Sequence, residues 1–141
     1  MSINDYVTEF NANIDQLLSE LELISKKLIT DGLITNDPIT HLNYYMNLCK
    51  TSRVLNQEIL IESMSTYILK NEEFVKRISL KDKEYFNNFD FTTKTKRTNI
   101  LELITCIRNI FNVLSSENQE IIFEYLQVLC TISFEYIKLK Y

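Results

Sequence analysis

Residues 3–31, INDYVTEFNANIDQLLSELELISKKLITD, carry the strongest structural pattern in the chain. Apolar residues recur here at alternating steps of four and three, which keeps them on one stripe of an α-helix for more than about three heptads. The stripe, called the seam below, consists of Ile3, Val7, Phe10, Ile14, Leu17, Leu21, Ile24 and Leu28. We therefore predict a long amphipathic helix over about residues 3–31.

Both ends of this helix have local signals. Ser2 is followed three residues later by Asp5, an acidic variant of the capping box, in which side chains accept from main-chain N–H groups at the start of a helix. Gly32 stands where a helix commonly ends in a left-handed residue.

The seam has two possible uses. It either packs onto the rest of the domain or forms an intermolecular coiled coil, in which case it is a candidate partner interface. Apolar residues off the seam, at Tyr6, Leu18, Leu23 and Ile29, favour packing because a wider stripe suits a globular core. The candidate interface comprises Val7, Phe10, Ile14, Leu17, Leu21, Ile24 and Leu28.

A second helical region follows over residues 38–70. Asp37 and Pro38 predict its start, as the N-cap and the first helical residue. Apolar spacing predicts an inner face with Leu42, Tyr45, Met46, Cys49, Leu55, Ile59, Leu60, Met64, Tyr67 and Ile68. The polar stretch 50–53 interrupts the pattern, which leaves open whether this region is one bent helix or two.

Short helices and a loop are predicted next. Asn71 is expected to cap a helix containing Phe74 and Ile78, and Ser79 with Asp82 predicts a capped segment ending near Phe89. Residues 92–98, TTKTKRT, contain no apolar residue and predict an exposed loop.

The C-terminal third predicts two antiparallel helices. One runs from Thr98 to Leu114 with an inner face of Ile100, Leu103, Ile104, Ile107, Phe111 and Leu114. Ser116 and Gln119 form a capping box for a last helix over about 117–139, so a tight turn at 115–116 joins the pair. Because the last helix is apolar nearly all round from Ile121 to Ile137, we expect it to be central and buried.

These elements predict an all-α fold. The 141 residues match one domain, with 45% hydrophobic and 24% charged residues. We expect a compact bundle of five or six helices over residues 1–141, with a long amphipathic N-terminal helix and a buried C-terminal helical hairpin.

Composition also bears on location. The N-terminus lacks a secretory signal, and no run approaches the roughly 20 apolar residues of a membrane span. Cys49, Cys106 and Cys130 are widely spaced and odd in number, which favours buried thiols in a reducing compartment. We therefore expect a cytoplasmic protein without membrane association.

Catalytic patterns are not found in the sequence. His41 is the one histidine, and on the predicted helix it lies about 12 Å from Cys49, too far to share a metal ion. Glu117, Glu120 and Glu124 share a helix face without the histidines that a di-iron site requires. One glycine in the whole chain excludes glycine-rich nucleotide-binding motifs. We predict no enzyme activity, catalytic residue, metal, cofactor or small-molecule substrate.

One segment is a candidate site for polyanions. Residues 76–97 contain seven bases and three acids, although the chain as a whole has a net charge of -4. Its aromatic run 85–91, YFNNFDF, leads into Lys94, Lys96 and Arg97, the candidate anion-binding residues. Aromatic and basic side chains together can bind single-stranded nucleic acid, whereas Phe86, Phe89 and Phe91 alone would suit a core.

Residues 114–129, LSSENQEIIFEYLQVL, resemble the closing segment of small helical proteins encoded by nucleocytoplasmic large DNA viruses. In that family an aromatic residue, usually Trp, precedes a Tyr-Leu-Gln-like run, and Phe123 takes that position here. Residues 67–72 and 82–86 are similar in the order of their aromatic and charged residues, so the likeness spans about half the chain. The resemblance implies viral origin and no particular activity, and it agrees with a composition typical of an AT-rich genome.

The leading functional prediction is a non-enzymatic viral protein that binds a protein partner or itself, in the virion or the infected host cytoplasm. The first alternative is a nucleic-acid-binding subunit that uses residues 76–97. The second is a Bcl-2-like inhibitor of host death signalling, an analogy at the level of fold.

Overall fold

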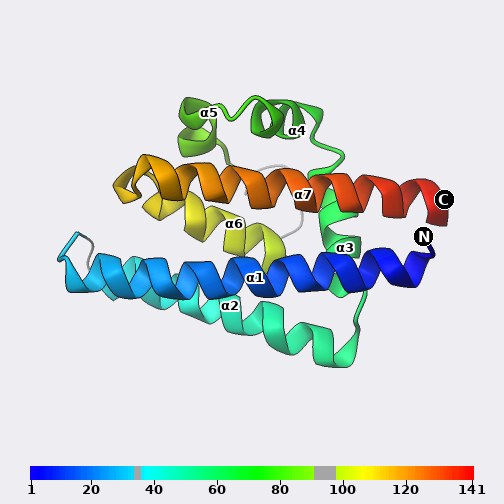
Figure 1. The fold of residues 1–141 in the computed structure, drawn as a ribbon, viewed down its shortest axis with the longest axis horizontal. Helices are drawn as coiled ribbons and strands as arrows, with labels where there is room; N and C mark the ends of the chain where they lie inside the picture. The colour runs from blue at the N-terminus through cyan, green and yellow to red at the C-terminus, as the bar shows by residue number, and fades with distance from the viewer. Residues whose placement is uncertain (34–35, 91–97) are drawn as a thin grey trace.

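The computed structural model describes residues 1–33, 36–90 and 98–141, and all of its regular structure is helical (Figure 1). Within these residues it has seven α-helices rather than the predicted five or six, because residues 59–88 divide into several short helices. The α-helices are α1 (Ile3–Thr30), α2 (Asn36–Leu55), α3 (Ile59–Ser63), α4 (Glu72–Ser79), α5 (Lys83–Asn88), α6 (Asn99–Ile110) and α7 (Ser116–Lys140). A π-helical turn, η1 (Met64–Ile68), continues α3, and a 3₁₀ turn, η2 (Phe111–Val113), follows α6.

Helix α1 forms as predicted. The Ser2 Oγ accepts from the Asp5 N–H at 3.2 Å, while the Asp5 carboxylate accepts from the Ser2 N–H at 2.8 Å. At the other end, Gly32 has φ of 68° in the left-handed region that glycine adopts without steric cost. The Ser2 and Asp5 bonds satisfy main-chain groups at the start of the helix, and beyond its end the Leu33 N–H donates to the Leu28 oxygen at 3.0 Å.

The seam of α1 lies in the core, so the prediction that it serves as a partner interface is corrected. Its candidate interface residues Val7, Phe10, Ile14, Leu17, Leu21, Ile24 and Leu28 are all buried within the single chain. Helix α1 runs alongside α7 for much of its length and also contacts α2 and α3 (Figure 1). The seam is therefore covered by this chain's own helices. Of the additional apolar residues that favoured packing, Leu18 is buried, whereas Leu23 and Ile29 are exposed and do not widen the buried stripe.

Residues 36–70 form more than one helix, and the break falls at 56–58 rather than at 50–53. The Asn56 Oδ1 accepts from the Glu58 N–H at 3.0 Å, and Asn11 of α1 donates to the main-chain oxygen of Gln57 at 2.9 Å. This turn, fixed by contact with α1, leaves Leu55 92% exposed instead of on the predicted inner face. Helix α2 also begins at Asn36, earlier than predicted.

Two caps were predicted for the short helices α4 and α5. The first is confirmed, and the second is made by a different residue. Asn71 caps α4 as predicted, with its Oδ1 accepting from the Phe74 N–H at 3.1 Å. Asp82 alone caps α5, by accepting from the Tyr85 N–H at 3.0 Å. Ser79 is instead the last residue of α4, since Leu80 and Lys81 turn the chain and Lys81 has φ of 54°.

Aromatic residues attach the α4–α5 segment to the core. The Phe86 ring lies 4.7 Å from that of Phe111 and 5.7 Å from that of Phe123, and Phe89 lies 5.2 Å from Phe74, measured between ring centroids. Phe86 and Phe89 are therefore core residues. Phe91 and the predicted loop from residue 92 to 97 lie outside the described residues.

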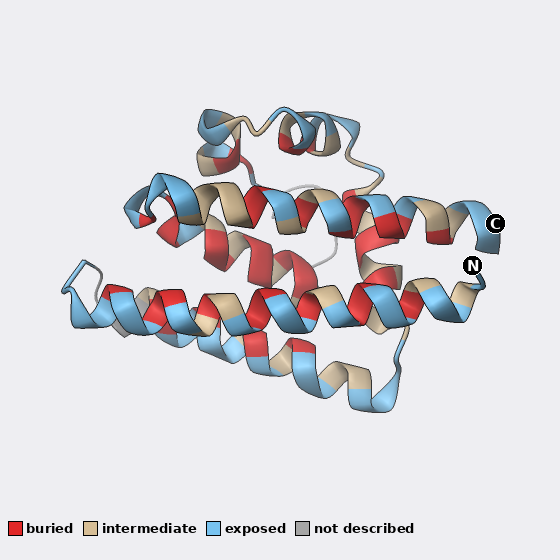
Figure 2. Ribbon diagram, in the orientation of Figure 1, coloured by how far each residue is buried: buried red, intermediate tan, exposed pale blue. Residues whose placement is uncertain are grey.

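The chain turns between α6 and α7 at Leu114 and Ser115 (Figure 1). This helical hairpin differs from the prediction in its cap and in which of its helices is more enclosed. Ser115, not Ser116, caps α7 by accepting from the Asn118 N–H at 3.1 Å. Buried residues are densest along α6 (Figure 2), which packs mainly on α2, whereas α7 packs mainly on α1. Since α7 leaves Phe134 exposed, α6 rather than α7 is the most enclosed helix.

Candidate functional site

The cysteine and histidine side chains have surroundings that do not favour catalysis. All three cysteines are buried and unbonded, and burial raises the pKa of Cys49 and Cys130 to about 12 and that of Cys106 to about 11. These thiols stay protonated at neutral pH, whereas a nucleophilic cysteine needs a depressed pKa. His41 is exposed on α2. No cluster of potential metal ligands occurs in the described part of the chain.

The basic segment is only partly described. The candidate anion-binding residues Lys94, Lys96 and Arg97 lie outside the described residues. Of the described bases, Arg77 pairs with Glu73 at 2.7 Å and with Asp82 at 3.0 Å, and Lys81 pairs with Glu120. Two of the four bases in residues 76–83 are therefore paired with carboxylates of this chain.

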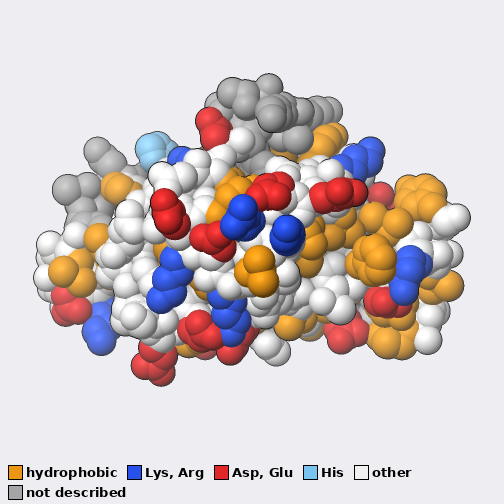
Figure 3. Space-filling view, turned by 90° about the horizontal axis from the view of Figure 1, so that it is seen from above, with side chains coloured by type: hydrophobic (Ala, Val, Ile, Leu, Met, Phe, Trp, Pro, Cys, Tyr) orange, Lys and Arg blue, Asp and Glu red, His pale blue; other side chains and the backbone are white. Residues whose placement is uncertain are grey.

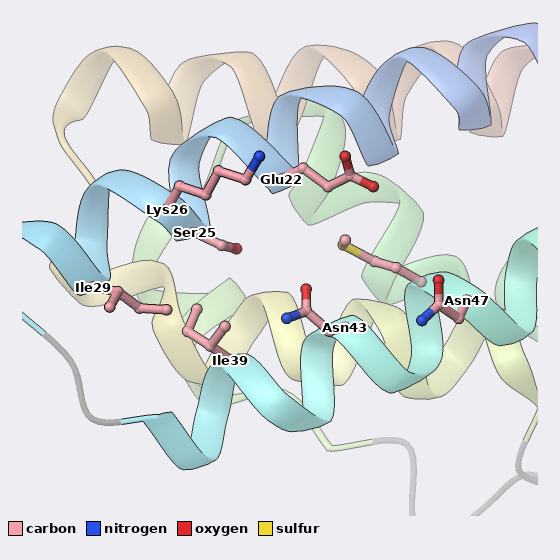
Figure 4. A pocket seen from close by; sticks show the side chains of 8 residues that line it. Glu22, Ser25, Lys26, Ile29, Ile39, Asn43 and Asn47 are labelled. Atoms are coloured by element: carbon pink, nitrogen blue, oxygen red, sulfur yellow. The ribbon is translucent and has the colours of Figure 1, made fainter.

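Two pockets lie between α1 and α2, and we call the surface that contains them the α1–α2 groove. Its first pocket encloses about 340 Å³ between the second half of α1 and the first half of α2 (Figure 4). The lining combines polar, charged and apolar side chains: Glu22, Ser25, Lys26, Ile29, Ile39, Asn43, Met46 and Asn47. Asn43 and Asn47 extend from α2 toward α1 and place two exposed amides along one wall.

Ser25 is the unusual residue of the first pocket. It is only 3% exposed, and its Oγ points into the space between the two helices (Figure 4). This hydroxyl has no hydrogen-bond partner among the described residues. A buried polar atom without a partner costs about 1–3 kcal/mol, so it is uncommon unless a ligand or water satisfies it.

The second pocket continues along the same two helices. It encloses about 460 Å³ and is lined by Thr8, Asn11, Ala12, Asp15, Lys50, Arg53, Val54 and Gln57. Asn11 is 8% exposed, and its Nδ2 donates to Gln57, while its Oδ1 has no partner in the part of the chain that the structure describes. Each pocket thus contains a buried polar side chain with one unsatisfied atom.

Charged groups hold this part of the groove in shape. The Arg53 Nη1 donates to the main-chain oxygen of Asn11 at 3.2 Å, and the same guanidinium pairs with Asp15. Between the pockets, the Lys50 Nζ lies 2.8 Å from Glu22, and this hydrogen bond lowers the pKa of the Glu22 carboxyl. Both side chains of that bridge are 44% exposed.

Sequence reasoning missed the groove because it treated α1 as a single apolar stripe. Asn11, Leu18 and Ser25 are spaced by seven residues and follow Phe10, Leu17 and Ile24 of the seam. All three are buried, so two polar residues occupy one heptad position of the inner face. This seven-residue repeat was the sequence pattern that could have indicated the groove, since polar side chains are seldom buried without a partner or a ligand.

Exposed apolar side chains gather elsewhere, toward the end of the molecule that holds the C-terminal part of α7 (Figure 3). They include Phe134, Leu139 and Tyr141, and the Lys138 ammonium lies 5.1 Å from the Phe134 ring centroid. No described helix is both long and apolar enough to cross a membrane.

Comparison with known proteins adds no relative. No protein-family model, curated protein or solved structure matches this chain.

Proposed function

We propose that this protein acts by binding a partner protein, and that the α1–α2 groove holds part of the partner's chain. One observation carries the proposal: two buried side chains, Ser25 and Asn11, line the two pockets of this groove, and each has a polar atom with no hydrogen-bond partner among the described residues. A ligand that supplies the missing hydrogen bonds would offset a cost that the free protein bears.

The chemistry of the lining supports a polypeptide ligand. Side-chain amides of Asn43, Asn47 and Gln57 offer both donors and acceptors, which is what main-chain N–H and C=O groups require. Apolar side chains, among them Ile39 and Met46, provide a smaller area for contact with partner side chains. Polar groups fix the orientation of a ligand, and apolar contact adds affinity.

The two alternative functions have less support. The residues proposed for nucleic-acid binding lie outside the described part of the chain, and the neighbouring bases Arg77 and Lys81 are paired. A Bcl-2-like protein needs an apolar groove for an amphipathic helix, whereas the α1–α2 groove is rich in amides and charges. Viral origin, and action in the virion or the host cytoplasm, remain predictions from the sequence resemblance.

Site-specific photo-crosslinking in the cells that naturally contain the protein tests the proposal. A benzophenone amino acid would replace Asn43 or Asn47 in the groove, and Thr131 or Glu117 on exposed α7 positions as matched controls. We expect both groove positions to crosslink to the same partner segment, identified by mass spectrometry, and the controls not to do so. Crosslinks confined to the control positions, or absent from all four, would contradict a partner in the groove.

A further inference from the structure

We propose that the α1–α2 groove binds an extended polypeptide segment of at least about six residues, which spans both pockets. The inference rests on the proposed function and adds to it the conformation and length of the bound segment.

The extended conformation follows from the polar lining. A helical ligand satisfies its own main-chain groups and presents side chains only, so it needs a continuous apolar stripe in the receptor. The groove has no such stripe in its described lining, because Asn43, Asn47 and Gln57 interrupt the apolar side chains. An extended segment leaves its N–H and C=O groups free to pair with these amides and with the unsatisfied Ser25 and Asn11 atoms.

The length follows from the spacing of the two unsatisfied atoms. Ser25 and Asn11 are 14 residues apart on one continuous helix (25 minus 11), which corresponds to about 21 Å along its axis. An extended chain advances about 3.3 Å per residue, so roughly six residues are needed to reach from one pocket to the other. A shorter segment satisfies only one of the two atoms.

The bridge between the pockets does not block such a segment. The Glu22 and Lys50 side chains are each 44% exposed, and exposed ion pairs contribute little to stability. A bound chain can therefore displace the bridge at little cost.

Peptides selected from a display library of random 12-residue sequences provide the probe. Selection would use wild-type protein, and the affinity of each selected peptide would then be measured by fluorescence anisotropy for the intact sequence and a truncation series. Isotope-edited NMR would report the bound conformation, since strong sequential Hα–HN contacts mark an extended chain and HN–HN contacts mark a helix.

The informative variant is Ser25→Ala, with Ser133→Ala as its matched control. Ser133 is also buried with an unsatisfied Oγ, but it lies on α7 and lines neither pocket. We expect Ser25→Ala to weaken peptide binding about tenfold without lowering the thermal midpoint, and Ser133→Ala to leave binding unchanged. An unchanged midpoint shows that the loss of affinity does not come from unfolding.

Each result distinguishes the inference from the proposed function. Full affinity that requires about six residues or more, extended contacts and a loss confined to Ser25→Ala would support the inference. Peptides that bind the groove as a helix, or with fewer than four residues, would overturn the inference and leave the proposed function standing. Failure of any peptide to bind the groove would overturn both.

Discussion

At the scale of single residues, Glu62, Tyr136 and Lys140 form a hydrogen-bonded cluster that ties the end of α7 to α3. The Tyr136 hydroxyl and the Lys140 ammonium both donate to Glu62, and Lys140 lies 2.9 Å from the tyrosine oxygen. Burial, followed by the hydrogen bond to Glu62, raises the pKa of Tyr136 to about 12, so the phenol remains a donor at neutral pH. Burial alone would raise the pKa of Glu62, but the bonds from Lys140 and Tyr136 outweigh it and lower that pKa.

Because the pKa of Glu62 is lowered, its contribution to stability should depend on pH. A carboxyl with a depressed folded-state pKa stabilises the protein above its unfolded pKa, near 4.5, and loses this contribution as pH falls through the folded value. We expect Glu62→Gln to lower the free energy of unfolding by roughly 1 kcal/mol at pH 7 and to have progressively less effect below pH ~4. Urea denaturation across this pH range measures the difference.

Glu58→Gln is the control for that experiment. Glu58 lies 4.0 Å from Lys140 and its side chain is more exposed than that of Glu62, so its removal should change stability little. Equal effects of the two substitutions at every pH would show that the cluster does not act through Glu62.

At the scale of the elements, two adjacent serines have different roles at the start of α7. Ser115 accepts from the Asn118 N–H, whereas Ser116 is already the first helical residue. Gln119 does not complete a capping box; it donates to the main-chain oxygen of Phe111 at 2.9 Å. This bond joins the α7 start to η2 and explains why the cap lies one residue earlier than the sequence pattern predicts.

We expect Ser115→Ala to destabilise the protein by about 1 kcal/mol, because it removes a helix cap. Ser116→Ala should change stability by less than about 0.5 kcal/mol, since an exposed first-turn position tolerates alanine. Thermal or urea unfolding of the two variants compares them directly. The opposite ranking would restore Ser116 as the cap.

At the scale of the whole molecule, α1 contributes both to the core and to the α1–α2 groove. Its seam packs mainly against α7, while the polar residues Asn11 and Ser25, on the same heptad position as Leu18, face the α1–α2 groove. The seam supplies stability, and the adjacent polar positions are the part of α1 proposed for binding. A single helix can carry both because neighbouring positions of the heptad point in different directions.

Two leucines on α1 test the contribution of the buried seam to stability. Leu21 is fully buried, so Leu21→Ala should lower the free energy of unfolding by about 2–5 kcal/mol. Leu23 is 65% exposed, and Leu23→Ala should change it by less than about 0.5 kcal/mol. Light scattering of the folded variants completes the measurement: a core seam leaves the mass in solution unchanged, whereas an intermolecular seam would change it in Leu21→Ala.

Local signals in the chain were sufficient for the all-helical class, the extent of α1, and its cap at Ser2. They also predicted the Asn71 cap and the inner face of α6. Each of these depends on residues within a few positions of one another, where periodicity and side-chain-to-main-chain hydrogen bonds act whatever the rest of the fold does.

Only the packed molecule decided the rest. The break at 56–58 depends on Asn11, 46 residues from Gln57, and α6 is the most enclosed helix because α2 covers it. The groove likewise exists because α1 and α2 meet along polar positions of both helices, including Ser25 and Asn43. Such features come from contacts between distant segments, and helical periodicity shows which face is apolar without showing which helix will cover it.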